Sequence, residues 1–416
     1  MGPAVSQPFP RVGHMRARGP DTATQPDTAT QPDTTPVGDP RPSGDTTRSG
    51  DTTQSGGSTG GTERSRAWAA TMGGHRGDAP SLRHAHAGGA HRLGPAPPAV
   101  HGGTREQREE AEDLLLAPGA TRARGAGRRA AEEAPDPERT CFERDRDRIL
   151  HASAFRRLAG KTQVFVFPED HQRTRLTHAL EVAQVATAIA LGHDCGHGPG
   201  GHASEDAFSP YVTGGYDHAV WGAEVVLEPL NLCAETLDGI RNHSWSRPLP
   251  STPEGEIVSW ADRIAYVCHD MEDAAHVGIV SDDMLPEVVR RHCGDRRSTR
   301  LGAFIEGVVQ ATRETGTVGM SEPLAEALAE FRRFNYEHIY MRPASLRQNE
   351  AVIRVLQALV EYHADRPNLL APGLEPGSEE ALRAAVTWVG GMTDRFAFAE
   401  ARAKLGWRTD DLPRGI

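Results

Sequence analysis

Three histidines and one aspartate lie within ten residues of this chain, in the run from His193 to His202. The run reads His-Asp-Cys-Gly-His-Gly-Pro-Gly-Gly-His, so glycines separate most of the imidazoles, and glycine lets the backbone approach a ligand closely. Neutral imidazole and carboxylate are common protein ligands of divalent metal ions. The run therefore predicts a metal site.

Two residues outside the run extend this prediction. His178 lies upstream in a segment with helical periodicity, and Asp262 lies downstream in the helical run Ile257–Met271. With His193 and Asp194 they make a set of two histidines and two aspartates, which favours Mn, Fe, Mg or Zn. Such a site, with open positions, is typical of a catalytic metal that lowers the pKa of water and binds a phosphate oxygen. Each histidine alone is better explained as a core or capping residue, and only the combined order and spacing favours the metal.

Helices must position these residues. We predict a capped helix over Thr104–Leu116, which ends before Pro118, and a second over Cys141–Arg157 with one buried face. The one expected strand is Gln163–Phe167. From Thr174 onward the helical period continues almost to the C-terminus, and its last third contains four amphipathic helices, at Leu301–Thr315, Pro323–Tyr340, Glu350–Ala364 and Glu379–Arg395. The fold class is mainly α.

Residues 1–103 are rich in Pro, Gly, Thr, Ser and Asp. Such a segment has too few large apolar side chains to offset the entropy of ordering, so we expect a disordered low-complexity arm. The histidines in this arm are not interleaved with acidic or cysteine ligands, so we assign them no metal.

Charge and cysteine content restrict the function and the compartment. The net charge is −11 and there is no basic stripe, so nothing argues for a partner of duplex nucleic acid. The five cysteines are odd in number and show no Cys-x-x-Cys spacing, which indicates a reducing compartment. We recognise no signal peptide and no apolar run long enough to cross a bilayer, so we expect a cytoplasmic protein without a membrane partner.

Several long motifs resemble one known family. They are Phe142–His151, Phe155–Leu158, Lys161–Phe165, Arg173–Val182, His193–His202, Trp260–Asp273 and Gly391–Arg395. In this order they resemble the deoxyguanosinetriphosphate triphosphohydrolase family of HD-domain metal hydrolases, over roughly Thr104 to Gly406. The resemblance implies a helical HD-domain core, which we place at 141–280. A helix and linker at 104–140 would precede it, and a C-terminal helical region at 281–416 would follow.

The resemblance also implies an activity. The family hydrolyses a deoxynucleoside triphosphate to the deoxynucleoside and inorganic triphosphate, by attack of water at the α-phosphorus. By resemblance, the divalent metal ion (Mn, Mg or Fe) would be held by His178, His193, Asp194 and Asp262. His197 matches a catalytic histidine, Glu205 the acid that works with it, and His218 a second catalytic histidine. A histidine and a glutamate in reach of each other exchange a proton near neutral pH, and a second histidine can protonate the departing 5′-oxygen.

Substrate contacts are expected from four residues. Arg175 lies three residues before His178, so its planar guanidinium could hold a phosphate beside the metal. Tyr266 and Asp270 follow Asp262 at i+4 and i+8, roughly on one helical face. The resemblance places both near the sugar, and Gln163 is a further sugar candidate. Without the resemblance, Tyr266 would be interpreted as a core aromatic residue and Asp270 as a solvated helix residue. His243 matches a motif to which we assign no role.

Three features depart from the family pattern. His178 and His193 are 15 residues apart, and one continuous helix between them would separate the histidines by about 22 Å. Gly200 replaces an aromatic residue that packs the loop, and Ala219 replaces a Glu or Asn. Three hypotheses follow: a working dNTP triphosphohydrolase, which we favour; an HD protein that binds nucleotide without turnover; and an HD phosphodiesterase acting on monophosphates or cyclic nucleotides. The resemblance further implies a homo-oligomer.

Overall fold

The computed structural model describes residues 75–76, 83–84, 104–168, 172–183 and 187–414. The chain divides into two compact units, Met1–Arg92 and Leu93–Ile416. In the first unit the described residues form a two-residue antiparallel pair, β1 (His75–Arg76) with β2 (Arg83–His84), which the sequence did not predict. The rest of the expected arm, residues 1–74, 77–82 and 85–103, lies outside the described residues.

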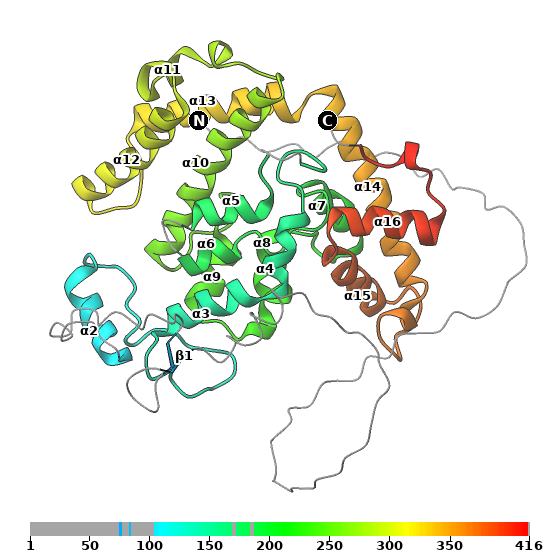
Figure 1. The fold of residues 1–416 in the computed structure, drawn as a ribbon, viewed down its shortest axis with the longest axis horizontal. Coiled ribbons are helices and arrows are strands. Elements are labelled where there is room, and N and C mark those ends of the chain that lie inside the picture. Colours follow the sequence, from blue (N-terminus) through cyan, green and yellow to red (C-terminus); the bar gives the residue numbers. More distant parts are fainter. Residues whose placement is uncertain (1–74, 77–82, 85–103, 169–171, 184–186, 415–416) are drawn as a thin grey trace, which may run out of the picture. The chain divides into compact units, whose positions relative to one another are not determined.

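The described part of the second unit is helical, as predicted (Figure 1). Its α-helices are α2 (Arg105–Leu115), α3 (Cys141–His151), α4 (Ser153–Arg157), α5 (Arg175–Val182), α6 (Thr187–Gly192), α7 (Ala203–Phe208), α8 (His218–Trp221), α9 (Ala234–Asn242), α10 (Pro253–His276), α11 (Glu287–Cys293), α12 (Arg297–Thr315), α13 (Glu322–Asn335), α14 (Pro343–Ala364), α15 (Glu379–Gly390) and α16 (Asp394–Leu405). Among the described residues, no helix is both long and apolar enough to cross a membrane.

Local sequence signals explain where several helices begin and end. The side chains of Thr104 and Thr140 cap α2 and α3, each in a reciprocal capping box. The helix expected over Cys141–Arg157 is interrupted at Ala152, which is extended and separates α3 from α4. Glu379–Arg395 is likewise divided, because α15 ends at Gly390 and Thr393 caps a new helix.

The strand predicted at Gln163–Phe167 is wrong. The only bridge at this segment joins Thr162 to Thr174, and no strand pairs with it in the part of the chain that the structure describes. Its apolar side chains divide between two cores: Val164 and Phe165 pack in the cluster around α10 and α13, while Val166 and Phe167 pack in the cluster around α14. The run of β-branched and aromatic residues therefore reflects burial against two helical cores, which a bent segment satisfies without a sheet.

The core that supports His178 and His193 lies between α3, α5, α6, α9 and α10. Ala179 and Val182 of α5 and Ile189 and Leu191 of α6 are buried in this one cluster. Outside it, α7 packs against α14, and α14 packs against α15 and α16 (Figure 1).

Candidate metal and phosphate site

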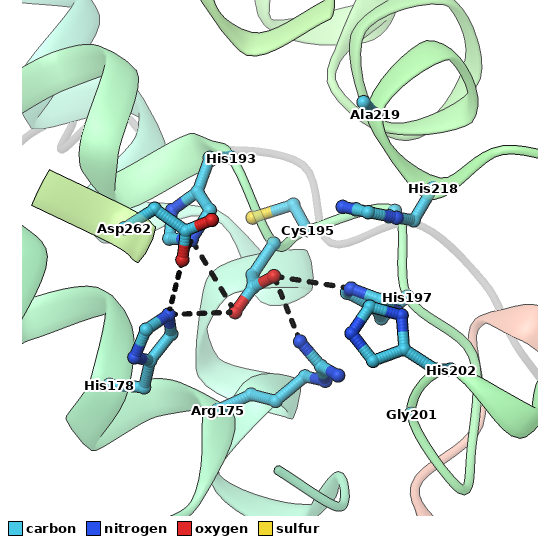
Figure 2. Close-up of polar contacts among 12 residues, drawn as sticks. Arg175, His178, His193, Cys195, His197, Gly201, His202, His218, Ala219 and Asp262 are labelled. Atoms are coloured by element: carbon cyan, nitrogen blue, oxygen red, sulfur yellow. Dashed lines mark hydrogen bonds and ion pairs between the residues drawn. The ribbon is translucent and has the colours of Figure 1, made fainter. Parts of the chain in front are cut away.

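The four predicted metal ligands come together. His178 of α5 lies with its Nε2 2.9 Å from Oδ1 of Asp262 on α10, and 3.9 Å from Oδ2 of Asp194. The Nε2 of His193 is 3.5 Å from Asp262 Oδ1 and 3.6 Å from Asp194 Oδ2. Figure 2 shows His178, His193 and Asp262 directed toward one another from three segments of the chain. Metal bonds of about 2.0–2.2 Å produce separations of this size between neighbouring ligand atoms.

Unpartnered atoms in this group fit a divalent cation. His193 Nε2 and Asp194 Oδ2 are buried and have no hydrogen-bond partner. The other nitrogen of His193, Nδ1, donates to the carbonyl of Ala190 at 2.5 Å, so Nε2 is the nitrogen that faces the proposed metal site. Burial by itself would raise the pKa of Asp194, but Arg175 and the neighbouring histidines hold it well below its usual range. Asp194 and Asp262 are therefore ionised, as a metal requires, whereas their two charges outweigh the effect of burial and raise the pKa of His193 to about 9, so a metal ion bound there would displace its Nε2 proton.

The short segment between His178 and His193 does not form one helix. The two rings lie 5.4 Å apart between centroids, because α5 ends at Val182 and α6 begins at Thr187. The continuous helix of about 22 Å is thus excluded, although the segment has no Gly or Pro before Gly192. Burying the apolar faces of two short helices in one core outweighs the alanine-rich preference for a continuous helix.

An ion-pair cluster fixes α5 against α10. Arg173 donates from its backbone and from Nη1 to Asp273, from Nη2 to Glu272 and from Nε to Glu181. Glu181 also lies 2.9 Å from Nδ1 of His269. These contacts join the start and the end of α5 to one stretch of α10, the helix that also carries Asp262.

Arg175 lies beside the ligands, where the sequence predicted it. Its Nη1 donates to Asp194 Oδ1 at 2.9 Å, and the side chain is almost completely buried. Its Nε and Nη2 have no partner, so two N–H groups of the planar fork are available to an anion.

A second cluster of histidines adjoins the ligands. His197 lies with its Nε2 3.3 Å from Asp194 Oδ1 and stacks on His218, with ring centroids 3.8 Å apart. Neither ring nitrogen of His197 has a hydrogen-bond partner. Burial, together with the positive charges of Arg175 and His218, holds the pKa of His197 well below its usual range, so this imidazole is neutral at pH 7.

Glu205 contacts a different histidine from the one expected. We predicted that it works with His197, but its carboxylate lies 2.6 Å from Nδ1 of His218 and 3.2 Å from Nδ1 of His202. Glu205 on α7 faces His218, the first residue of α8, and the backbone N–H of His218 also donates to the Glu205 carboxylate at 3.0 Å. Burial lowers the pKa of His218, but the Glu205 carboxylate outweighs this effect and the net pKa is raised.

His243, to which the sequence assigned no role, belongs to this cluster. Its Nδ1 donates to the carbonyl of Ile240 at 2.7 Å, and its Nε2 lies 3.2 Å from Nε2 of His218. Burial and the charges of His193 and His218 lower the pKa of His243 to about 3, so it is the acceptor in this contact. A protonated His218 can then donate to Glu205 through Nδ1 and to His243 through Nε2.

Of the three predicted sugar contacts, Asp270 and Tyr266 bind side chains outside the predicted ligand set. Asp270 is buried and accepts from the hydroxyl of Tyr340 at 2.5 Å, and burial raises the pKa of Asp270 to about 7. The hydroxyl of Tyr266 accepts from Arg332 Nε at 2.8 Å. Gln163 has a buried Oε1 without a partner. No contact joins any of these three side chains directly to the four ligands in the described residues.

Gly200 is held in a conformation that an aromatic residue would not adopt. Its φ is +74°, and a Cβ there would lie 2.3 Å from Cγ1 of the buried Val352. Its N–H donates to Asp394 Oδ1 at 2.9 Å. At this position a polar contact from α16 holds the backbone of the loop.

Substituting Gly200 with alanine should destabilise the fold by about 2–5 kcal/mol, since a left-handed backbone and an overpacked contact with Val352 both cost energy. The matched control is Gly214→Ala, where φ is +87° but nothing lies within 4 Å of the added Cβ. Urea denaturation should show the larger loss for Gly200→Ala. Equal losses in the two variants would show that the packing against Val352 is not tight.

Comparison with known proteins agrees with this geometry. Residues 175–267 match the model of the HD domain, and residues 318–403 match that of the phosphohydrolase-associated domain. A deoxyguanosinetriphosphate triphosphohydrolase-like protein of Caldanaerobacter subterraneus is 39% identical over 316 residues, which cover 70% of this chain and 93% of the relative. Proteins of the same description from Deinococcus deserti and Cereibacter sphaeroides are 33% and 32% identical, over 71% and 69% of this chain and 95% and 98% of their own lengths.

Proposed function

Because this chain belongs to the family of deoxyguanosinetriphosphate triphosphohydrolase-like proteins, which are HD-domain phosphohydrolases, we propose that it hydrolyses dGTP or related deoxynucleoside triphosphates to the deoxynucleoside and inorganic triphosphate. One observation carries the proposal. His178, His193 and Asp262 form one group, and Asp194 lies beside it; they adjoin a buried arginine with two unpartnered nitrogens and a neutral histidine with two unpartnered nitrogens. Such a site can hold a cation and several phosphate oxygens together (Figure 2).

The metal ligands in this proposal are His178, His193, Asp194 and Asp262. A divalent ion held there would act as a Lewis acid toward a phosphate oxygen and would lower the pKa of water. The His178–Asp262 contact marks where the cation would replace a proton between the two side chains.

Arg175 orients the polyphosphate. Its Nη1 is committed to Asp194, and this contact fixes the plane of the guanidinium so that Nε and Nη2 face the substrate as a preorganised pair of donors. No rotamer has to be selected when the phosphate arrives, because the side chain is already immobilised by burial.

Proton transfer is assigned to two histidines. His197, which is neutral and lies beside Asp194, accepts the proton of the attacking water. His218, with its raised pKa, would shift its Nε2 proton from the contact with His243 to the departing 5′-oxygen, and Glu205 stabilises its charged form. Tyr266, Asp270 and Gln163 are proposed to contact the deoxyribose.

Two alternatives predict different outcomes. A protein that binds nucleotide without turnover would release nothing, and a phosphodiesterase would act on nucleotide monophosphates or cyclic nucleotides. The grouping of His178, His193 and Asp262, with Asp194 3.6–3.9 Å from both histidines, supports a metal-assisted reaction at this site.

The products distinguish these functions. With dGTP and Mn²⁺, ³¹P NMR should detect inorganic triphosphate and no pyrophosphate, and removal of the metal with EDTA should stop the reaction. Release of pyrophosphate or orthophosphate would contradict the proposal, and so would complete inactivity across Mn²⁺, Mg²⁺ and Fe²⁺.

A further inference from the structure

The backbone of the catalytic loop, His193–His202, is held by side chains rather than by regular secondary structure. The hydroxyl of Tyr216 donates to the carbonyl of Gly196 at 2.6 Å. Ser204 Oγ accepts from the N–H of Gly198 at 3.0 Å and donates to the carbonyl of Gly201 at 2.7 Å. These contacts come from α7 and the segment that follows it, close to the loop in sequence. Two others come from residues much further away.

The first distant contact comes from Asp394, the first residue of α16. Its Oδ1 accepts from the N–H of Gly200 at 2.9 Å, and its Oδ2 accepts from the hydroxyl of Thr162 at 2.5 Å. The carboxylate is buried, so both contacts are shielded from water. Asp394 therefore joins the loop to the segment that precedes the HD domain, across 194 and 232 residues of sequence.

The second distant contact comes from Lys161, the residue next to Thr162. Its ammonium donates to the carbonyl of His197 at 2.5 Å and to the carbonyl of Gly390, the last residue of α15, at 3.0 Å. The side chain is buried. A buried lysine is costly unless its N–H groups are satisfied, so these two carbonyls fix its position, and it fixes theirs.

We propose that Asp394 and Lys161 are positioning residues through which the phosphohydrolase-associated domain sets the geometry of the catalytic loop. Asp394 and Gly390 belong to the segment that matches this domain, whereas His197 and Gly200 belong to the HD domain. This inference rests on the proposed function, because it concerns the same site.

The loop contacts bear on groups assigned to chemistry. Lys161 binds the carbonyl of His197 itself, so its loss would let this residue turn its imidazole away from Asp194. Asp394 holds Gly200, and the next residue, Gly201, is packed so closely that a Cβ there would lie 3.0 Å from Nη2 of Arg175. A displacement of the loop would therefore disturb both the proposed base and the proposed phosphate donor, and a misplacement of about 1 Å can reduce a rate about 10²-fold.

The experiment compares three variants of the full chain. Asp394→Ala removes both contacts, and Asp394→Asn retains an acceptor for Gly200 and can donate to Thr162. The control is Glu379→Ala, which removes the acidic first residue of the neighbouring α15 and its 3.1 Å contact with Thr213, far from the loop in sequence. Three quantities are measured: kcat and KM for dGTP with Mn²⁺, Mn²⁺ affinity by calorimetry, and amide hydrogen exchange of peptides that cover residues 193–202.

For Asp394→Ala we expect kcat to fall about 10²-fold with little change in KM or Mn²⁺ affinity, and exchange in the loop to accelerate. Asp394→Asn should restore most of kcat, and Glu379→Ala should leave kcat and loop exchange unchanged. Unchanged kcat and exchange in Asp394→Ala would overturn the proposal. So would a loss of kcat that Asp394→Asn does not restore, or one that Glu379→Ala matches.

A variant of Lys161 tests the proposal independently, in case Asp394→Ala does not fold. Lys161→Met should also reduce kcat and accelerate loop exchange while the protein stays folded by circular dichroism, and a folded variant with unchanged values would contradict the role of Lys161. If the unmodified protein releases no triphosphate from dGTP, the proposed function fails. Loop exchange in Asp394→Ala then decides alone whether the carboxylate holds the loop.

Discussion

Replacing Asp194 with alanine should reduce triphosphate release more than about 10²-fold. Changing a residue that only supports a metal ligand reduces metal affinity or activity about 10–100-fold, and Asp194 is assigned as a ligand itself. It lies within 4 Å of His178, His193, Arg175 and His197, so it joins the cation site to the phosphate donors. Calorimetry should show weaker Mn²⁺ binding in parallel with the loss of turnover.

The controls separate this effect from misfolding. Asp194→Ala leaves Arg175 buried without its partner, which destabilises a protein by about 3–5 kcal/mol. Asp194→Asn keeps an acceptor for Arg175 but loses the ligand charge, and it should be folded and nearly inactive. Asp206→Ala, which removes an exposed acid on α7 outside the ligand set, should behave as the unmodified protein. Full activity in folded Asp194→Asn would refute the ligand assignment.

Replacing His218 with glutamine should lower kcat by about 10²–10⁴-fold, the range over which a positioned general acid contributes. KM should change little, because His218 is assigned to proton donation and not to binding. Steady-state kinetics with dGTP measure both constants. The natural comparison is His202→Gln, which removes the exposed histidine that also contacts Glu205 and should cost far less.

The pH dependence tests the same pair. Glu205 raises the pKa of His218, so the proton-donating form persists above the ordinary pKa of histidine and activity falls only as pH rises through the raised value. Glu205→Gln removes the stabilising charge, so the alkaline limb of the kcat profile should move to lower pH. An alkaline limb at the same pH in Glu205→Gln would show that another group donates the proton.

The sequence predicted the helical class, and it predicted the four side chains that the structure brings near one another, from residue types, their order and local periodicity; their role as ligands stays a prediction. Capping boxes at Thr104 and Thr140 are local signals, and the structure confirms the helices that they begin. The strand at Gln163–Phe167 was predicted wrongly because a run of valines and phenylalanines indicates burial and does not reveal whether a partner strand exists.

Long-range contacts were beyond sequence reasoning. The separation of α5 from α6 depends on their shared core, which a helix-propensity argument does not include. The pairing of Glu205 with His218, the place of His243 and the anchoring of Gly200 by Asp394 all join segments that only the fold brings together. The sequence did single out Lys161 as one of two lysines in the chain. Nothing in the sequence indicated that its side chain would be buried.

The most direct test of the proposed function is hydrolysis of dGTP with Mn²⁺ in H₂¹⁸O, followed by ³¹P NMR and mass spectrometry of both products. Attack of water at the α-phosphorus predicts inorganic triphosphate that carries one ¹⁸O on a terminal phosphorus, with unlabelled deoxyguanosine. Label in the nucleoside, or pyrophosphate together with a nucleoside monophosphate, would contradict the proposed reaction.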